Sequence, residues 1–325
     1  MREFSTAARA ELARVRPDDR CCARAELGGI LRAGGSLCLL GHGRVAISVE
    51  TEHADVARKV VILFRRVAGL PVEIVVEEHE QLRRRRVYRI LIAPGPEARR
   101  LLGELVILGP GGEIGSDIPA ALVRGECCRA AFLRGAYLMS GSVCDPRGSS
   151  YHLEIVARSE ELGQGLCYLL NLLRLKAHLM ARKGKHVVYL KDADDIGSFL
   201  KLIKAHAALL ELEEVRVVKE VRGGVNRLVN AETANVDKSV AAAQDQIHLI
   251  EAIEAGIGLD RLPAALRQLA RVRLAHPEAS LAELGQLMPR QISKSAVNHR
   301  LRRLRRYAET NTAGGGARNG FQQKR

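Results

Sequence analysis

The sequence CCARAELGGILRAGGSLC, residues 21–38, occurs a second time in modified form as CCRAAFLRGAYLMSGSVC, residues 127–144. The two stretches align without a gap at a spacing of 106 residues, and eight of their 18 positions are identical. The identical pairs are Cys21/Cys127, Cys22/Cys128, Ala25/Ala131, Leu27/Leu133, Gly29/Gly135, Gly35/Gly141, Ser36/Ser142 and Cys38/Cys144. An internal repeat of this kind indicates a duplicated structural unit.

The chain downstream of each copy predicts the same elements in the same order. In the first half they are a strand, a helix, two strands and a helix, at residues 44–49, 52–68, 72–78, 87–92 and 96–105. In the second half the corresponding segments are 150–155, 159–174, 175–181, 186–190 and 193–206. We therefore expect an α+β fold with a duplicated αββαββα unit, its halves joined by the glycine-rich segment 109–119.

The repeated stretch predicts a helix with glycines in its interior. Gly35 is placed to supply a left-handed residue after the last turn. Gly28, Gly29 and Gly135 lie inside the predicted helices, where each costs about 1 kcal/mol relative to Ala. Two pseudo-symmetric helices that cross backbone to backbone would offset this cost. The alternative is an ordinary duplication that tolerates its glycines, and the recurrence of Gly29 as Gly135 favours close packing.

Residues 27–36 and 133–142 each resemble a degenerate LAGLIDADG motif of the homing endonucleases. The resemblance implies two motif helices that join two αββαββα halves, whose four-stranded sheets form a saddle on DNA. It also implies an acidic residue just before the terminal glycine of each motif, which holds a catalytic divalent metal ion. Gly34 and Ser140 occupy those positions here. Neither is a carboxylate, whereas Mg²⁺ needs charged oxygen ligands.

The nearest carboxylates in the sequence, Glu26 and Asp145, do not replace the missing pair. Glu26 lies at the opposite end of its helix, and Asp145 lies in a turn beyond the helix end. We therefore expect no catalytic residue, no nuclease activity and no bound metal ion or cofactor.

Seven cysteines are present, an odd number without a C-x-x-C pair. A chain of 325 residues does not need disulfides to bury a core. The adjacent pairs 21–22 and 127–128 cannot easily share one tetrahedral metal ion. We interpret all seven cysteines as buried thiols and predict no metal site.

The formal net charge of +14 is concentrated at the C-terminus. Residues 261–325 hold 14 Lys and Arg against three Asp and Glu, which leaves a net of +3 for residues 1–260. A strongly basic balance indicates a polyanionic partner, either nucleic acid or an anionic membrane surface. Aromatic residues make up only 3% of the chain, which argues against stacking on unpaired bases and favours double-stranded DNA.

No segment of the sequence predicts a membrane span or a secretion signal. The longest apolar runs, such as 60–64, are too short to cross a bilayer, and the first residues lack an apolar signal region. We expect a cytoplasmic protein associated with the nucleoid, without a membrane partner.

Three capped helices are predicted in the basic C-terminal region. The first begins at Pro263 and places Leu262, Leu266, Leu269 and Val272 on one side. The second begins with a capping box, Ser280 to Glu283, and points Leu281, Leu284 and Leu287 inward. Ser293 caps the third, 294–309, whose apolar face is Val297, Leu301, Leu304 and Ala308.

A short helix, a turn and a basic helix are typical of helix-turn-helix DNA binding. The candidates for reading base edges in the major groove are Lys294, Ser295, Asn298, His299 and Arg302. The candidates for phosphate contacts are Arg300, Arg303, Arg305 and Arg306. The alternatives are a solvated basic helix, which two preceding capped helices disfavour, and an amphipathic membrane helix, which lacks Trp or Phe anchors.

Basic residues also occur in the predicted hairpin loops of both halves. They are Arg83, Arg84, Arg85, Arg86, Lys183 and Lys185, with Arg44, Arg147 and Arg182 nearby. These residues either contact phosphates as a secondary surface or serve solubility alone, and the sequence leaves both open.

We divide the chain into a first LAGLIDADG-like repeat (1–108), a second repeat (109–215), a linker helix (216–260), a helix-turn-helix domain (261–309) and a disordered tail (310–325). Within the linker, Asn226, Asn230 and Asn235 suit caps and turns. The tail has no apolar periodicity.

The combination of a degenerate double LAGLIDADG body with a helix-turn-helix resembles the WhiA family of bacterial regulators. The most specific parts are the two motifs, the Asn-rich segment 225–235 and the stretch ISKSAVNHRLR, residues 292–302. Gly223, Gly224 and Ala231 depart from the family pattern. The resemblance implies a DNA-binding protein with roles in cell division and chromosome segregation, and a transcriptional regulator of sporulation in filamentous spore formers.

We therefore expect a non-enzymatic regulator that binds double-stranded DNA. The alternatives are an interaction scaffold that binds RNA polymerase or a division protein, and an active nuclease. Because each half of the duplicated body already supplies the other's partner, a monomer is sufficient.

Overall fold

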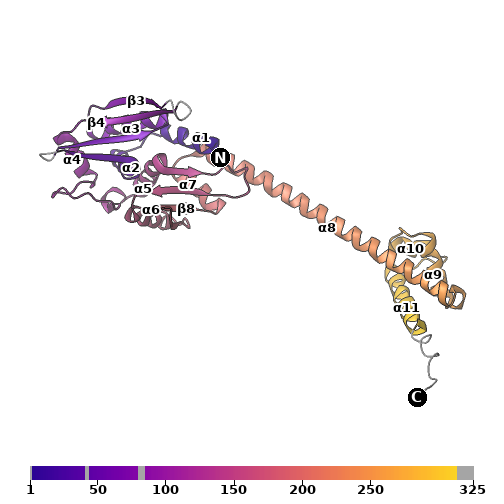
Figure 1. Cartoon of the computed structure of the whole chain (residues 1–325). Helices are drawn as coiled ribbons and strands as arrows, with labels where there is room; N and C mark the ends of the chain where they lie inside the picture. The colour runs from indigo at the N-terminus through magenta and orange to yellow at the C-terminus, as the bar shows by residue number, and fades with distance from the viewer. Residues whose placement is uncertain (1, 41–43, 80–84, 313–325) are drawn as a thin grey trace, which may run out of the picture. The chain divides into compact units, whose positions relative to one another are not determined.

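The computed structural model describes residues 2–40, 44–79 and 85–312 of the chain (Figure 1). They form two compact units, residues 1–219 and 220–325, which are described separately.

The first unit contains the predicted duplication. Its first repeat consists of α2 (Arg20–Gly34), β1 (Gly35–Leu40), β2 (Arg44–Thr51), α3 (Ala54–Ala68), β3 (Glu73–His79), β4 (Arg85–Ile92) and α4 (Pro96–Glu104). The second consists of α5 (Glu126–Ser140), β5 (Gly141–Val143), β6 (Leu153–Ala157), α6 (Glu160–Leu172), β7 (His178–Arg182), β8 (Lys185–Leu190) and α7 (Ala193–Leu202). The short 3₁₀ helix η1 (Ala120–Leu122) lies between them. The αββαββα order and the α+β class are confirmed.

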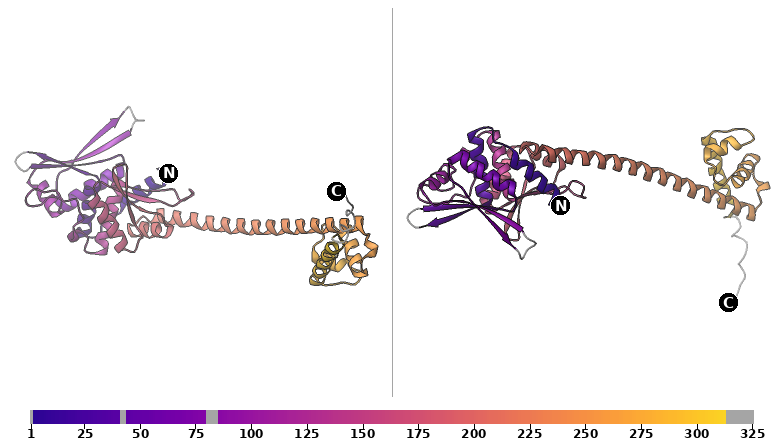
Figure 2. Two further views of the ribbon diagram at one scale, coloured as in Figure 1. Left: turned by 60° about the horizontal axis from the view of Figure 1, so that its bottom comes forward. Right: turned by 90° about the horizontal axis from the view of Figure 1, so that it is seen from above.

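Each repeat builds one four-stranded antiparallel sheet. The strand orders are β1-β2-β4-β3 and β5-β6-β8-β7, so the two sheets have the same topology. Alternate residues of β2, namely Val45, Ile47 and Val49, are buried. This period of two places one face of the sheet against the helices and leaves the other face to solvent, as Figure 2 shows for both sheets.

Helices α2 and α5 cross with their backbones in direct contact. A Cβ atom on Gly29 would lie 2.2 Å from the carbonyl oxygen of Phe132, and one on Gly135 would lie 2.2 Å from that of Glu26. Any side chain at either position would therefore separate the helices. The predicted close crossing is confirmed, and it offsets the helix propensity that the glycines lose.

The predicted left-handed residue after the first motif helix is wrong. Gly35 has φ −75° and ψ 150°, so the chain passes directly from α2 into the extended backbone of β1. Gly35 is instead required by space, because its Cβ atom would lie 2.6 Å from the carbonyl oxygen of Leu31. Gly141 makes the same transition from α5 into β5 with φ −81°.

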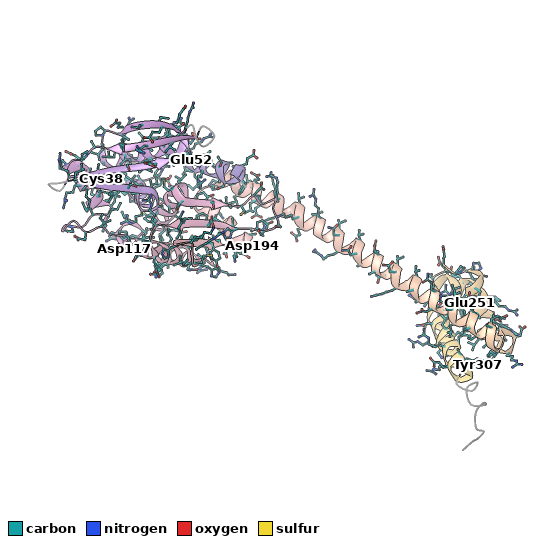
Figure 3. All side chains as sticks on the ribbon, in the orientation of Figure 1. Cys38, Glu52, Asp117, Asp194, Glu251 and Tyr307 are labelled. Atoms are coloured by element: carbon teal, nitrogen blue, oxygen red, sulfur yellow. The ribbon has the colours of Figure 1, made fainter. Side chains whose placement is uncertain are left out.

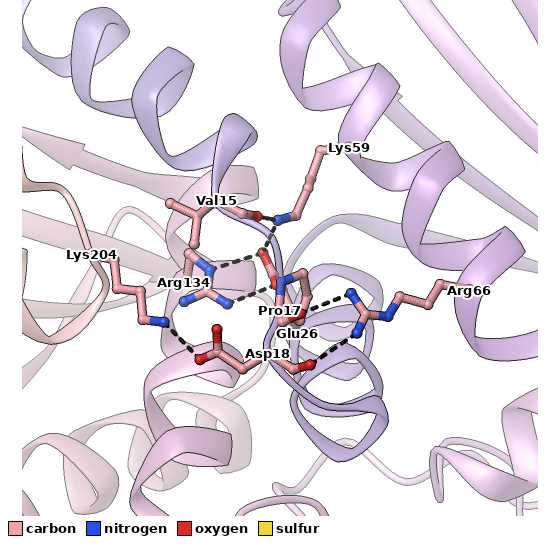
Figure 4. A network of polar contacts seen from close by, with 8 residues as sticks. All are labelled: Val15, Pro17, Asp18, Glu26, Lys59, Arg66, Arg134 and Lys204. Atoms are coloured by element: carbon pink, nitrogen blue, oxygen red, sulfur yellow. Dashed lines mark hydrogen bonds and ion pairs between the residues drawn. The ribbon is translucent and has the colours of Figure 1, made fainter.

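An ion cluster that the sequence did not reveal is buried between the repeats (Figure 4). The carboxylate of Glu26 on α2 accepts two hydrogen bonds from Arg134 on α5, at 3.0 and 2.8 Å. The Lys59 ammonium on α3 lies 3.0 Å from the same carboxylate and also donates to the Val15 carbonyl oxygen. All three side chains are at most 3% exposed. Burial lowers the pKa of Lys59, and the Glu26 charge opposes that shift.

A further helix, α1 (Arg2–Arg14), was not predicted. It buries Phe4, Ala8 and Leu12, which follow one another at the four-residue spacing of a helix face. The signal was therefore present in the sequence.

The second unit begins within α8 (His206–Gly256) and contains η2 (Leu259–Arg261), α9 (Ala264–Ala275), α10 (Leu281–Leu287) and α11 (Lys294–Thr312). The prediction of caps and turns at Asn226, Asn230 and Asn235 is wrong, since all three lie inside the continuous helix α8. Residue 216, where we predict the linker helix to start, lies within α8. Residues 310–312 of the predicted tail belong to α11, and residues 313–325 lie outside the described residues.

The second unit has its own apolar core. It comprises Ile250, Ile253, Leu259, Leu262, Leu266, Leu269, Ala270, Leu284, Met288, Val297, Leu301 and Leu304. The predicted inward position of Leu287 is wrong, since this residue is 46% exposed. Helix α10 ends at Leu287, and the extended backbone of Met288 turns that side chain into the core instead.

The prediction that all seven cysteine thiols are buried is also wrong. Cys21, Cys38 and Cys127 are exposed, and Cys144 and Cys167 are half-buried.

Of the helices in the described part of the chain, none is long and apolar enough to cross a membrane.

Candidate nucleic-acid interface

The basic helix α11 is capped and anchored as its sequence predicts. The Ser293 hydroxyl accepts a hydrogen bond from the Ala296 amide (3.3 Å). Val297 and Leu304 are fully buried, and Leu301 is 8% exposed. Tyr307, labelled in Figure 3, donates its hydroxyl to the Arg261 carbonyl oxygen (3.4 Å) and ties α11 to the segment before α9. One face of α11 is therefore packed into the core of the second unit, and the opposite face, called the free face below, is exposed.

The predicted base-reading residues share the free face. Lys294, Ser295, Asn298, His299 and Arg302 are all exposed. Their spacing places them on the side of the helix opposite Val297 and Leu304. The same periodicity brings Arg305 and Arg306 onto this face one to two turns further along. Arg303 is exposed at its edge, and Arg300 is half-buried beside the apolar face.

Most cations on this face are not neutralised by the protein. Among the described residues, no carboxylate pairs with Lys294, Arg302, Arg303 or Arg305. Elsewhere in the same unit, Arg271 lies 2.8 Å and Arg267 3.7 Å from the Asp260 carboxylate. The positive charge of the second unit is therefore least compensated along α11.

The turn before α11 is fixed by tight packing and by caps. Gly285 on α10 accepts a hydrogen bond at its carbonyl from the Ile292 amide (3.0 Å), and a Cβ atom on Gly285 would lie 2.3 Å from the Ile292 carbonyl oxygen. The predicted capping box is confirmed. The Ser280 hydroxyl accepts a hydrogen bond from the Glu283 amide (3.3 Å), and the Glu283 carboxylate accepts one from the Ser280 amide (2.7 Å). This exchange of hydrogen bonds lowers the pKa of the Glu283 carboxyl.

Arg273 is a structural residue that the sequence did not single out. It is 1% exposed, and its guanidinium donates to the carbonyl oxygens of Ala279 (2.6 Å), Pro277 (3.3 Å) and His276 (3.5 Å). It therefore holds the connection between α9 and α10, and burial lowers its pKa. In the sequence Arg273 looks like the exposed arginines of α11, and no local pattern separates the buried arginine from the exposed ones.

The possible secondary contacts on the sheets are partly neutralised. Arg86 on β4 lies 2.7 Å from Glu78, and Arg89 lies 2.7 Å from Glu50 and 2.6 Å from Glu77. Lys183 and Lys185 are exposed at the hairpin between β7 and β8. Arg85 is the first residue of β4, and Arg83 and Arg84 lie outside the described residues.

The position of the LAGLIDADG metal site is filled by this chain's own side chains. A Cβ atom on Gly34 would lie 2.3 Å from Cε of Met139, so no carboxylate fits there without displacing Met139. The Ser140 hydroxyl donates back to the Ala136 carbonyl oxygen (3.3 Å). Arg9 donates to the Gly141 carbonyl and Arg158 to the Gly35 carbonyl. Two fixed cations at the helix ends disfavour binding of a divalent cation, so these residues do not fit the catalytic metal.

These features define a class of protein: a duplicated LAGLIDADG-like body with an altered catalytic junction, followed by a helix-turn-helix domain. Three family models match the chain in the same order. The WhiA N-terminal LAGLIDADG-like domain matches residues 20–108, the WhiA LAGLIDADG-like domain residues 129–222, and the WhiA C-terminal HTH domain residues 225–308. The chain belongs to the WhiA family.

Similar proteins match over nearly the whole chain. The probable cell division protein WhiA of Heliobacterium modesticaldum is 43% identical over 313 residues, which cover 96% of this chain and 98% of that protein. The probable cell division protein WhiA of Desulfitobacterium hafniense (strain Y51) is 44% identical over 306 residues, which cover 94% and 95%. The crystal structure of full-length DUF199/WhiA from Thermatoga maritima matches with a TM-score of 0.58 and 28% identity, covering 95% of this chain and 98% of that one.

Proposed function

We propose that this protein is a non-enzymatic regulator that binds double-stranded DNA through α11. The observation that carries the proposal is the exposed face of α11, where Lys294, Arg302, Arg303 and Arg305 have no carboxylate partner among the described residues. Unpaired cations on such a face can neutralise DNA phosphates and release the counterions bound to them, which favours binding. A cation that is already paired within the protein releases fewer counterions.

The residues divide into two roles by their chemistry. Asn298 pairs with an adenine edge and Arg302 or Lys294 with a guanine edge in the major groove, while Ser295 and His299 complete the base-reading set. Arg300, Arg303, Arg305 and Arg306 contact phosphates and fix the register of the helix on the duplex. The hairpin residues Lys183 and Lys185 are secondary contacts in this proposal.

The LAGLIDADG-like body acts in this proposal as a non-catalytic frame. Gly34 and Ser140 supply no carboxylate. The Met139 side chain fills the space beside Gly34, and Arg9 and Arg158 bring positive charge to the ends of the two motif helices. Incubation of the full chain with plasmid and Mg²⁺ tests this directly. We expect no nicking, and Mg²⁺-dependent nicking that persists through purification would contradict the proposal.

Fluorescence anisotropy of the full chain with a labelled duplex, at a series of salt concentrations, tests the role of α11. Arg303→Ala should weaken binding to every duplex and lower the salt slope by about 1, since one phosphate contact is lost. Asn298→Ala should mainly reduce the preference between sequences, by about 1–3 kcal/mol at one base pair.

The matched control is Arg271→Ala, which removes an arginine of the same unit that is already paired with Asp260. It should leave the salt slope unchanged. An equal loss from Arg271→Ala and Arg303→Ala, or no loss from Arg303→Ala, would show that α11 is not the DNA-binding face.

The cellular role proposed is regulation of transcription linked to cell division and chromosome segregation, supported by relatives that carry the name of a cell division protein. Chromatin immunoprecipitation discriminates this role from a scaffold that binds RNA polymerase or a division protein. Discrete promoter peaks that disappear in Arg303→Ala support regulation. Diffuse or absent signal supports the scaffold.

A further inference from the structure

Four cysteines from the two repeats meet at one end of the α2–α5 pair. Cys21 and Cys22 lie in the first turn of α2, and Cys127 and Cys128 lie in the first turn of α5. They are the first two pairs of identical residues in the duplicated motif. The close crossing at Gly29 and Gly135 brings the two helix ends, and with them the two thiol pairs, together.

The sulfur atoms are close enough to share one ligand. The Sγ atoms of Cys21, Cys22 and Cys128 all lie within 4.8 Å of one another. Cys127 is the neighbour of Cys128 in the first turn of α5, and its thiol interacts electrostatically with both Cys22 and Cys128. A tetrahedral zinc site with Zn–S bonds of about 2.3 Å needs sulfur atoms about 3.8 Å apart, a contraction that rotation of the side chains can supply.

The cluster combines buried and accessible members. Cys22 and Cys128 are buried, whereas Cys21 and Cys127 are exposed. Each repeat therefore contributes one inner and one outer sulfur, and the outer pair leaves a path by which an ion can enter.

A disulfide explains this arrangement less well than a metal ion does. Adjacent residues have Cα atoms 3.8 Å apart, below the range of about 4.4–6.8 Å that disulfides prefer, which disfavours a bridge within either pair. A single bridge between the helices would use two sulfurs and leave the other two without a role. Three sulfur donors lie within 4.8 Å of one another and a fourth lies in the same helix turn. Four soft sulfur donors are the ligand set that Zn²⁺ binds in closed structural sites.

We propose that Cys21, Cys22, Cys127 and Cys128 form a four-thiolate site for a single Zn²⁺ ion. The ion joins the first turns of α2 and α5 and so links the two repeats at the ends remote from Gly34 and Ser140. Its role is structural, and it is independent of the altered catalytic junction. The prediction of no metal site considered each adjacent pair alone, whereas the fold supplies two pairs to one position.

The experiment uses the full chain, stripped of metal and kept reduced under inert gas, titrated with Co²⁺. We expect thiolate-to-cobalt charge-transfer absorption and tetrahedral visible bands that saturate at one Co²⁺ per chain and disappear when Zn²⁺ is added. Zinc should also raise the midpoint of thermal unfolding by several degrees, since it binds the folded chain preferentially.

Variants assign the ligands. Cys21→Ser and Cys128→Ser, one from each repeat, should each weaken cobalt binding by roughly 100-fold, because a four-coordinate site loses a charged ligand. Cys21 is exposed, so its variant keeps the core intact if Cys128→Ser fails to fold. The matched controls are Cys38→Ser and Cys144→Ser, which remove the third repeated pair, of which Cys38 is labelled in Figure 3. They should bind cobalt like the parent chain.

Several results would overturn the proposal. One is cobalt binding that does not reach one ion per chain, and another is an equal loss of cobalt binding in the control variants. A third is iron with inorganic sulfide in the purified chain. A fourth is a disulfide between Cys21 or Cys22 and Cys127 or Cys128 in protein isolated without oxidant. Because the cluster lies outside α11, Cys21→Ser should leave DNA binding intact, and failure of one proposal does not affect the other.

Discussion

The first sheet and helix α11 both carry arginines, but the two surfaces differ in how far those arginines are paired with carboxylates. On the sheet, Arg89 lies between Glu50 and Glu77, and Arg86 pairs with Glu78. On α11, no carboxylate among the described residues pairs with Arg302, Arg303 or Arg305. The pairing of basic residues, more than their number, therefore decides which surface can attract a polyanion.

The largest expected effect comes from removing the partner of the buried cations. Glu26→Ala leaves Lys59 and Arg134 buried without a counter-charge and should lower the free energy of unfolding by about 3–5 kcal/mol, measured by chemical denaturation. Glu78→Ala removes the partner of an exposed arginine and should cause no measurable change.

If Glu26→Ala does not fold, replacing the whole cluster separates charge from packing. The triple variant Glu26→Leu/Lys59→Met/Arg134→Met should regain most of the lost stability, because no unpaired charge remains. A triple variant as unstable as Glu26→Ala would show that the ion pairs themselves, and not their balance, stabilise this region.

A smaller effect is expected from disturbing the support of α11. Gly285→Ala places a methyl group against the Ile292 carbonyl and should cost about 1–3 kcal/mol, with DNA affinity lost at a lower temperature than in the parent chain. Gly224→Ala is the matched control, since a Cβ atom there meets open space on α8, and it should stabilise the chain by about 0.5–1 kcal/mol. Equal thermal behaviour of the two variants would contradict the tight packing of the turn.

The smallest effect tests the comparison itself. Glu50→Gln/Glu77→Gln releases Arg89 from its partners and should raise non-specific affinity for duplex DNA a few-fold at low salt, with the salt slope larger by about 1. Arg89→Ala in the parent chain should leave both quantities unchanged. No gain in the double variant would mean that this sheet does not approach DNA at all.

Local patterns in the sequence predicted the elements and their caps well. The repeat predicted two equivalent αββαββα units, and the glycines at 29 and 135 predicted the crossing that the structure contains. The capping box at Ser280 and the buried spacing of Val297, Leu301 and Leu304 were likewise correct. These features depend on residues within a few turns of one another, so periodicity is sufficient to find them.

Features that depend on distant segments were missed. Glu26 and Arg134 are separated by 108 residues, and no local pattern indicates that they meet. The thiol cluster likewise exists only because α2 and α5 cross. Arg273 contributes to the basic balance of residues 261–325, and nothing in the sequence indicates that it is buried against the carbonyl oxygens of a turn. Residue type alone cannot distinguish a solvated cation from one that the fold encloses.

The ion cluster also breaks the symmetry of the duplication. At the repeat spacing, Glu26 corresponds to Phe132 and Arg134 corresponds to Gly28, so each half carries only one side of the pair. Two copies of the first half would leave each Glu26 with Lys59 but without the Arg134 guanidinium, and two copies of the second half would bury Arg134 without a carboxylate. The halves have thus become as unlike as the two subunits of an obligate heterodimer. A chain cut between α4 and α5 should reassemble only from one fragment of each kind.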